Sequence, residues 1–302
     1  MVTYRYMQYD VFTRRPLTGN QLAVFPEPSG LTSCLMQRLA LEMACPETTF
    51  ILPPDDGETD VRLRIFTPRR ELPMAGHPTI GSTFALAGAG LLGSDRSQIV
   101  FGLGVGPTPV ALEWAGNELD FAWMRQPMPE LGPAIDERRE VTSALSLAPE
   151  ALAPALPVQV ASSGVPFLLV PLSTRRDVDA ATLDRSALRP LLARRRLDEL
   201  PVFLFSLEQG HDDATAYSRM FAPGFGIPED PATGGATGPL AAYLVHHGAV
   251  ARETTSDLVS LQGVAMKRPS RLHIGVEVED GMVTSVRVGG TAVLVAEGTV
   301  YL

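Results

Sequence analysis

The segment Ile65-Phe-Thr-Pro-Arg-Arg-Glu-Leu-Pro-Met-Ala-Gly-His-Pro-Thr-Ile-Gly81 recurs in a degenerate form in the second half of the chain. The second copy is Met220-Phe-Ala-Pro-Gly-Phe-Gly-Ile-Pro-Glu-Asp-Pro-Ala-Thr-Gly-Gly235. Each copy begins with an aromatic residue, a small residue and a proline, and then runs through a small-residue turn into an apolar helical segment. This repeat predicts a duplicated fold of two similar halves.

The repeat also brings polar side chains to two predicted helix starts. The helical segments cover residues 82–90 and 239–248, with His77 at the start of the first and Asp230 just before the second. A helix N-terminus offers free backbone N–H groups and a partial positive charge, which suits an anion. Two such helix starts, one in each half, predict a cleft that binds a small carboxylate.

Composition narrows the class of protein. The 302 residues are 45% hydrophobic, enough for one large core or two smaller ones. The formal net charge of −9 argues against a nucleic-acid-binding surface, and no apolar run approaches the length of a membrane span. Cys34 and Cys45 have no ligand-like spacing and are expected to be reduced thiols. The chain is therefore expected to be cytoplasmic, without nucleic-acid or membrane partners and without a metal site.

Short strand-like segments alternate with a few helices along the chain. Thr32 to Ala44 is predicted to be a helix capped by Thr32 or Ser33, and Val61 to Ile65 has the alternation of a half-buried strand. The proline-rich segment 125–129 marks a domain boundary. We expect one domain of residues 1–125 with a C-terminal strand from 290–302, and a second domain of residues 126–289. Further helices are expected near 136–147 and 181–194, and a hairpin closed by Asp280-Gly281.

Two side chains are candidates for proton transfer. Glu47 follows Pro46 and precedes an apolar strand. A carboxyl group in a largely apolar cleft has a raised pKa, which suits a group that both accepts and returns a proton; the alternative is an exposed loop glutamate. His77 is either a hydrogen-bond donor or proton relay, or a structural imidazole at a helix start.

The second copy of the repeat supplies the other candidates. Asp230 is either an acceptor for a substrate ammonium or hydroxyl group, or a turn or helix-capping residue; the two roles are compatible. Gly234 and Gly235 either let the backbone approach a ligand closely or serve ordinary turn geometry.

Several motifs, in order along almost the whole chain, resemble those of the phenazine-biosynthesis PhzF-like family. Its relatives by fold are the diaminopimelate epimerases and proline racemases. The matching segments are Tyr9-Asp-Val-Phe-Thr, Gly19-Asn-Gln-Leu-Ala-Val-Phe25, Glu47-Thr-Thr-Phe-Ile51, Glu71-Leu-Pro-Met-Ala-Gly-His-Pro78, Glu229-Asp-Pro-Ala-Thr-Gly234 and Gln262-Gly-Val-Ala-Met-Lys-Arg-Pro-Ser270.

The resemblance implies an α+β fold of two pseudo-symmetric domains, each a barrel-like, mostly antiparallel sheet around a central helix. It implies a homodimeric isomerase without a cofactor, which moves a proton along a conjugated ring. The implied catalytic residues are Glu47 as the acid/base, with His77 and Asp230 as polar partners. The implied substrate-binding residues are Gly76, Asn20, Thr233, Gly234 and Gly235, although the family often has Ser where this chain has Gly235.

Two other functions are alternatives. An amino-acid racemase or epimerase of the same fold would use a cysteine at each of the two helix starts, and here those places hold His77 and the 233–235 turn. The other alternative is a duplicated scaffold that binds a metabolite or a protein without catalysis, against which the acid/base set speaks.

Overall fold

The chain folds into two compact units. The computed structural model describes residues 2–55, 57–250, 258–279 and 281–302. Unit 1 consists of Met1–Arg125 with Arg287–Leu302, and unit 2 of Gln126–Val286. The boundaries expected from the sequence, after residues 125 and 289, lie at or within a few residues of these positions. Each unit is described here by itself.

Unit 1 is a sheet with two helices. Its strands are β1 (Thr3–Val11), β2 (Asn20–Phe25), β3 (Glu47–Leu52), β4 (Val61–Phe66), β5 (Glu71–Leu72), β6 (Gln98–Leu103), β7 (Gly106–Ala115), β8 (Glu118–Arg125) and β18 (Ala292–Tyr301), and its helices are α1 (Ser33–Met43) and α2 (Gly76–Gly88). β18 pairs with β1, and β1 with β2, in antiparallel register. The pairs β2–β3 and β4–β6 are parallel, and the remaining ladders are antiparallel.

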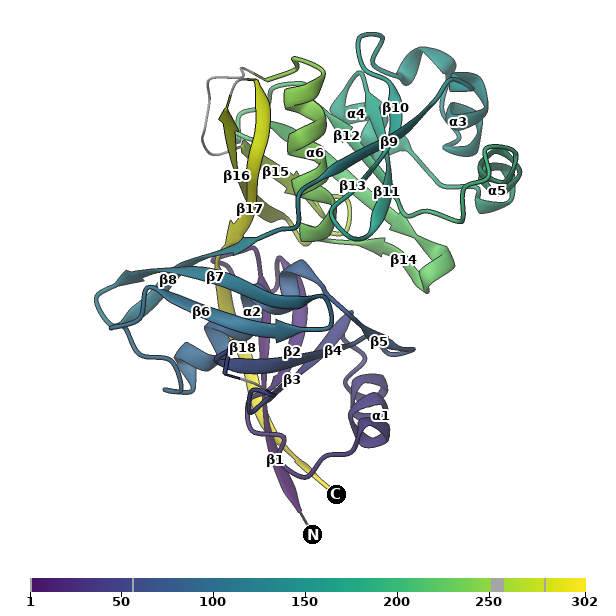
Figure 1. Ribbon diagram of the computed structural model, residues 1–302. Coiled ribbons are helices and arrows are strands. Elements are labelled where there is room, and N and C mark those ends of the chain that lie inside the picture. Colours follow the sequence, from purple (N-terminus) through teal and green to yellow (C-terminus); the bar gives the residue numbers. More distant parts are fainter. Residues whose placement is uncertain (1, 56, 251–257, 280) are drawn as a thin grey trace. The chain divides into compact units, whose positions relative to one another are not determined.

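The helix α2 is enclosed by this sheet. It contacts β1, β2, β3, β8 and β18 (Figure 1), and every residue from Gly76 to Leu86 is buried. A helix that is apolar on all sides must be covered on all sides, so the sheet curves around it. The helix begins six residues before the predicted segment 82–90, and Pro78 fits because the first turn needs no N–H donors.

The outer side of β2, β3 and β4 is covered by α1. Phe25 and Phe50 stack with ring centroids 5.0 Å apart, and Phe66 meets Phe50 edge-on at 5.5 Å. Met36 and Leu39 of α1 pack against this aromatic row. The predicted cap is confirmed, because the Thr32 hydroxyl accepts a hydrogen bond from the backbone N–H of Leu35.

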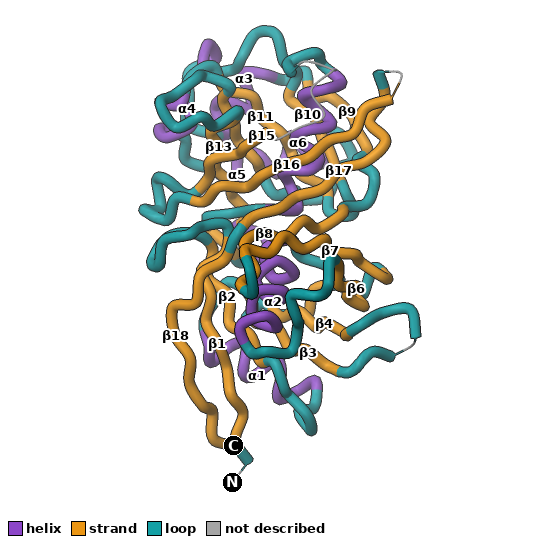
Figure 2. The backbone as a smooth tube through the Cα atoms, turned by 90° about the vertical axis from the view of Figure 1, so that its left-hand side faces the viewer, coloured by secondary structure: helices purple, strands orange, loops and turns teal. Residues whose placement is uncertain are grey.

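Unit 2 repeats the order of connections found in unit 1. Its strands are β9 (Glu130–Ile135), β10 (Val158–Ser162), β11 (Pro166–Leu172), β12 (Val202–Ser206), β13 (Ala216–Ala222), β14 (Ile227–Asp230), β15 (Leu258–Gln262), β16 (Ser270–Glu279) and β17 (Met282–Gly290), and its α-helices are α3 (Arg138–Ala144), α4 (Arg175–Ala180), α5 (Arg185–Arg194) and α6 (Gly234–His246). The pairs β11–β12 and β13–β15 are parallel, as β2–β3 and β4–β6 are in unit 1. β16 and β17 run side by side in both views (Figures 1 and 2), and residues 287–290 at the end of β17 belong to unit 1, where they pair with β8.

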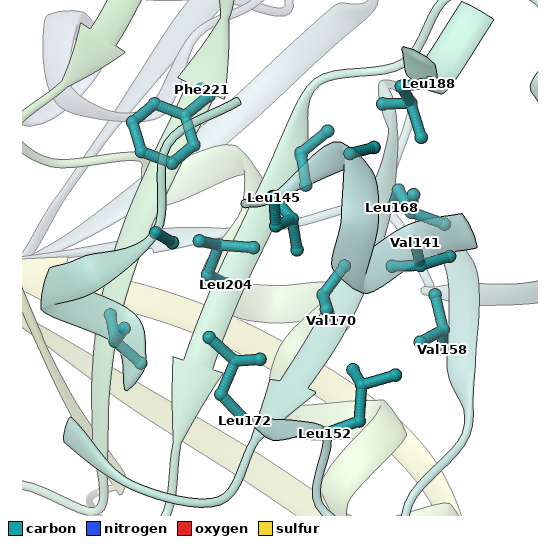
Figure 3. Close-up of a cluster of buried hydrophobic side chains, with 14 of the residues drawn as sticks. Val141, Leu145, Leu152, Val158, Leu168, Val170, Leu172, Leu188, Leu204 and Phe221 are labelled. Carbon is teal, nitrogen blue, oxygen red and sulfur yellow. The ribbon is translucent and has the colours of Figure 1, made fainter. Parts of the chain in front are cut away.

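The sheet of unit 2 has a hydrophobic cluster on each face. Leu168, Val170 and Leu172 alternate along β11 and pack toward α3, α4 and α5 (Figure 3). The intervening residues Phe167 and Leu169 face the opposite cluster, which includes α6. A strand that is covered on both faces has apolar residues at nearly every position, so β11 lacks the alternation of polar and apolar residues that marks a half-buried strand.

The secondary structure departs from the expectation in a few places. The helix expected near 181–194 is α5, which Asp184 caps, whereas α4 before it was not predicted; Thr174 forms a capping box with Asp177 at its start. The strands β5, β6, β9 and β14 were not predicted. The strands expected around Asp280-Gly281 are present, whereas Asp280 lies outside the described residues.

Each unit is therefore a mostly antiparallel sheet around one buried helix, and the two units share one topology. The predicted α+β duplication is confirmed.

The close packing of α2 on β1 and β2 leads to a stability prediction. A Cβ atom on Gly81 would lie 2.5 Å from Leu22 Cδ2 and 2.7 Å from Val11 Cγ2, and both of these side chains are fully buried. Gly81→Ala should lower the free energy of unfolding by about 1–2 kcal/mol, because overpacking outweighs the helix propensity gained. Urea unfolding measures the change.

The matched control is another glycine inside a buried helix. A Cβ on Gly235 would meet only the Phe167 ring, at 3.7 Å, which is an ordinary contact. Gly235→Ala should leave the stability unchanged or slightly higher. Equal effects of the two substitutions would contradict this account of the packing.

Candidate active site

Glu47 is buried at the start of a central strand. The left-handed residue Ala44 ends α1, and the chain then passes through Cys45 and Pro46 into β3. Glu47 is the first residue of β3 and lies beside Leu22 of β2 in the parallel register. Only 6% of Glu47 is exposed, so it is not an exposed loop glutamate.

His77 lies beside Glu47. It is the second residue of α2 and is 5% exposed. Its Nε2 atom is 3.2 Å from Oε2 of Glu47, a short approach that is not well aligned as a hydrogen bond. On the other side of the ring, Nδ2 of Asn20 is 3.3 Å from Nδ1. Three of the predicted site residues, from β2, β3 and α2, are therefore in contact within unit 1.

The imidazole of His77 is neutral. Burial lowers its pKa from 6.5 to about 3, and a backbone hydrogen bond with Gln21 offsets only part of this effect. The charged form is disfavoured because a buried cation loses its hydration. At neutral pH, His77 therefore contributes one N–H donor and one nitrogen acceptor, and no charge.

The lowered pKa of His77 predicts a pH-dependent stability. Below pH 6.5 the unfolded chain binds a proton at His77 that the folded chain does not bind, so the free energy of unfolding falls as the pH falls toward 3. The contribution is fully present above pH 6.5. Between about pH 7 and pH 5 the loss should be about 2 kcal/mol, at about 1.4 kcal/mol for each pH unit.

Urea unfolding of His77→Gln at several pH values tests this prediction. The variant should lack the loss that wild type shows over this range, while His211→Gln, at an exposed histidine, should retain most of it. If the curves for wild type and His77→Gln ran parallel, burial of a neutral His77 would be the wrong explanation.

The second group of polar residues lies in unit 2, at the start of α6. Asp230 ends β14 and is 8% exposed, and its Oδ2 accepts a hydrogen bond of 2.5 Å from the Thr233 hydroxyl. The Gln262 side chain accepts from the Thr233 backbone N–H at 3.0 Å, and donates to the Asp230 carbonyl at 2.7 Å and to the Thr233 hydroxyl at 3.0 Å. Asp230 is thus held by a buried network rather than placed in a simple turn.

Sequence reasoning gave Gln262 no role. It ends β15 and is fully buried, and its amide fixes the turn that precedes α6. A polar amide at the end of the apolar strand Leu258–Gln262 was the available signal, because a buried amide needs partners for both of its ends.

The two glycines of the second motif belong to the first turn of α6. The Gly234 carbonyl accepts a hydrogen bond of 2.8 Å from Nε2 of Gln126. Gly235 has no positive φ, and a Cβ there would fit, so neither turn geometry nor packing demands a glycine at this position. Gly238 differs, because a Cβ there would collide with the Gln126 amide oxygen.

The units carry their polar groups at different places in the shared topology. In unit 1, β2 begins at Asn20, and its third residue, Leu22, pairs with the first residue of β3. In unit 2, β11 begins at Pro166, and its third residue, Leu168, pairs with the first residue of β12. Those first residues are Glu47 in unit 1 and Val202 in unit 2.

The helix starts and the segments before them differ in the same way. His77 is the second residue of α2, and Gly235 is the second residue of α6. Four residues before the helices stand Leu72 and Asp230, respectively. The two units thus share their backbone connections, but a polar side chain in one unit stands where the other unit has an apolar residue or a glycine. That the set in unit 1 and the set in unit 2 act on one ligand stays a prediction.

The cysteines do not take the places of a thiol pair. Cys34 lies exposed on α1 and Cys45 is buried just before Glu47, so both belong to unit 1 and neither starts α2 or α6. Across the described part of the chain, no group of three or more His, Cys, Asp or Glu side chains could hold a metal ion. No helix within the same residues is long and apolar enough to cross a membrane.

Three comparisons place the chain among known proteins. The family model of the phenazine biosynthesis-like proteins matches residues 9–298. The trans-2,3-dihydro-3-hydroxyanthranilate isomerase of Pseudomonas aeruginosa is 35% identical over 300 residues, covering 99% of this chain and 100% of the relative. The crystal structure of a PhzF-family phenazine biosynthesis protein from Bacillus anthracis has a TM-score of 0.89 at 27% identity and covers 100% of both chains.

A more distant structure shares the fold alone. A hydroxyproline epimerase from Agrobacterium vitis has a TM-score of 0.67 at 13% identity, covering 99% of this chain and 92% of the epimerase. The architecture is therefore the one common to PhzF proteins and these epimerases. With a family match over nearly the whole length and a relative of the same length named as an isomerase, the chain belongs to the phenazine biosynthesis-like (PhzF) protein family and is an isomerase.

Proposed function

We propose that this isomerase moves a proton, and with it a double bond, within a small cyclic carboxylate, with Glu47 as the acid/base. The observation that carries the proposal is the buried contact between Glu47 and the neutral imidazole of His77. An imidazolium would hold the neighbouring carboxylate in its ionised form, whereas a neutral ring lets it take up and release a proton.

The proposed reaction has a simple balance. Glu47 removes a proton from an sp3 carbon of the ring, and the electron pair of that C–H bond shifts into the conjugated system. The same carboxyl group then returns a proton to a carbon further along the ring, so the substrate and the product have one composition. No electrons are gained or lost, and the enzyme ends in its starting protonation state.

The placement of the polar groups supports a proton shift over racemisation. A racemase that works from both faces of one carbon needs a base on each side. At the positions that correspond to Asn20, Glu47 and His77, unit 2 has Pro166, Val202 and Gly235, which carry no titratable group. A single carboxyl group that both accepts and donates the proton fits this asymmetry.

The helix starts are suited to the substrate carboxylate. The residue before α2, Ala75, makes no side-chain cap, and the Thr233 hydroxyl before α6 donates to Asp230 instead of capping its helix. The first turns therefore lack the side-chain acceptor that commonly caps a helix, and an anionic group of the substrate would take that role. The homodimer and the absence of a cofactor implied by the family resemblance stay predictions.

The relative from Pseudomonas aeruginosa suggests the first substrate to try. We propose that this chain acts on the same chemical class, a hydroxylated or aminated cyclohexadiene carboxylate. Incubation in D2O with trans-2,3-dihydro-3-hydroxyanthranilate and a panel of related ring carboxylates, followed by mass spectrometry, reports deuterium taken up at carbon. Exchange into free amino acids instead of ring carboxylates would favour the racemase alternative.

Glu47→Gln should separate binding from chemistry. The amide keeps the shape of the side chain but cannot take up a proton, so deuterium exchange should fall about a hundredfold or more, the usual contribution of a positioned proton-transfer group. Binding of the ring carboxylate, measured by calorimetry, should be nearly unchanged. Glu42→Gln, at an exposed glutamate of α1, is the control. Exchange by Glu47→Gln at the wild-type rate would exclude Glu47 as the acid/base.

Asp230→Asn should behave differently from Glu47→Gln. The substitution removes the charged acceptor of the Thr233 hydroxyl and loosens the start of α6, so both binding and turnover should weaken. Loss of a hydrogen bond to a charged group predicts a Kd at least roughly tenfold higher. Calorimetric titration with the same ring carboxylate measures it, and an unchanged Kd would show that Asp230 is a structural residue only.

A further inference from the structure

Arg219 of β13 is a buried cation that ties three elements of unit 2 together. Only 8% of the residue is exposed. Its Nε and Nη2 atoms donate to the two carboxylate oxygens of Glu229 on β14, at 2.8 and 2.9 Å, and its guanidinium lies 4.7 Å over the ring of Phe221. Its Nη1 atom donates, at 2.9–3.0 Å, to three backbone carbonyl groups at the end of α4, those of Val178, Asp179 and Ala181. A guanidinium presents its donors in a fixed planar fork, so this Arg–Glu clamp defines the position of Glu229 closely.

Unit 1 has the same clamp at the corresponding place. Arg64 and Arg219 each stand two residues before the aromatic residue that opens a copy of the repeat. Arg64 donates from Nε and Nη2 to the carboxylate of Glu71 on β5, at 2.7 Å each, and lies 5.0 Å over the ring of Phe66. Its Nη1 atom donates to the hydroxyl of Ser33, the first residue of α1, at 2.8 Å. In both units the clamp therefore joins a strand, the short strand after it and an outer helix.

The two clamps are alike where the polar groups beyond them differ. Unit 1 has Leu72 four residues before its buried helix, where unit 2 has Asp230. At the second position of the helix, unit 1 has His77 and unit 2 has Gly235. What the two clamps share is their place, since each one fixes the short strand that leads into the start of the buried helix.

The main-chain pairing of β14 defines the position of this strand only in part. The strand has four residues, and its ladder with β13 shifts register between Met220 and Ala222. Adjacent residues of a strand point to opposite faces, so Glu229 faces the clamp while Asp230 faces the start of α6. Because the two residues are neighbours in one short strand, the anchor at Glu229 sets the position of the Asp230 carboxylate.

We propose that Arg219 is a positioning residue, which holds the Asp230 carboxylate at the start of α6 by anchoring Glu229 beside it. This role rests on the proposed function of Asp230 in binding the substrate. The Asp230 carboxylate accepts from the Thr233 hydroxyl, and the Gln262 amide donates to both residues, so a shift of β14 would disturb the whole network. Arg219 thus acts on the ligand through Asp230, without contacting the ligand itself.

Glu229→Gln loosens the clamp with little change of shape. The amide keeps one acceptor oxygen for the guanidinium, but it loses the charge and the second hydrogen bond. Asp212→Asn is the matched control in the same unit. Arg175 makes a two-point ion pair with Asp212 and lies 5.1 Å over the ring of Tyr217, but this pair joins α4 to the loop before β13 instead of to β14.

Binding and hydrogen exchange together report the position of Asp230. Glu229→Gln should raise the Kd of the ring carboxylate roughly threefold or more, and Asp212→Asn should leave it unchanged. In the Asp230→Asn background, Glu229→Gln should cause no further rise, because its effect passes through Asp230. Without any ligand, the backbone amide hydrogen of Thr233 should exchange faster, relative to amides later in α6, in Glu229→Gln but not in Asp212→Asn.

An ion pair that only stabilises the fold would give a different result. Urea unfolding measures the stability that each variant loses. If Glu229→Gln lost stability but kept the wild-type Kd and the wild-type exchange at Thr233, the proposal would be overturned. Effects of Glu229→Gln and Asp230→Asn on the Kd that simply added would overturn it too. Arg219→Lys keeps the charge but not the planar fork, so it should change both readouts in the same direction, and it replaces Glu229→Gln if that variant does not fold.

The outcomes also separate this inference from the proposed function. If the Thr233 amide responds to Glu229→Gln as expected but Asp230→Asn leaves the Kd unchanged, the positioning role stands and the binding role of Asp230 falls. If Asp230→Asn weakens binding but neither readout responds to Glu229→Gln, the binding role stands and the positioning role falls. The exchange measurement needs no ligand, so it decides the positioning role even if no ring carboxylate binds.

Discussion

The helices α2 and α6 are each buried inside the sheet of their own unit. Nearly every residue of each helix lies in the interior, so the surrounding sheet has to curve around it. Such a helix can meet polar ligands only at its ends. Its first turn has N–H groups without intrahelical partners, and the strands that enclose it bring their own first residues to the same region. The enclosed helix thus determines where polar side chains can gather.

The neutral state of His77 follows from the same enclosure. A histidine at an exposed helix start would titrate near its ordinary pKa, whereas burial in unit 1 lowers the pKa to about 3. The imidazole is then a fixed hydrogen-bonding group and not an acid. In the proposed reaction, Glu47 is accordingly the group that exchanges the proton, and His77 lies beside it without a charge.

The sequence predicted those parts of the fold whose signals are local. Thr32 capped the expected helix, Val61 to Ile65 formed the expected strand, and the repeated aromatic-small-proline step marked the duplication. It placed the starts of α2 and α6 too late, because Gly and Pro in their first turns have poor helix propensity and only burial in the sheet overrides it.

The site was predicted in part. The motifs named Glu47, His77 and Asp230, and the first two are in contact in the folded protein. The role of Gln262 was missed because its partners, Asp230 and Thr233, are about thirty residues away in sequence and meet it only in the folded sheet. The sequence also did not predict that Glu47 and Val202, or His77 and Gly235, occupy equivalent positions in the two units. They depend on strand register and helix starts, which the repeat alone does not define.

Unit 1 is built from two distant pieces of chain, and this has a consequence for the order of folding. β18 pairs with β1 from Thr3–Tyr301 to Val11–Ala292, whereas unit 2 is a single continuous segment. During synthesis, the whole of unit 2 emerges before the strand that completes the sheet around α2. β1 is thus made before unit 2, whereas its partner β18 is made after it, and until β18 arrives β1 has an unpaired edge that could pair with another chain. The time for which this edge stays unpaired is set by the length of chain between β8 and β18.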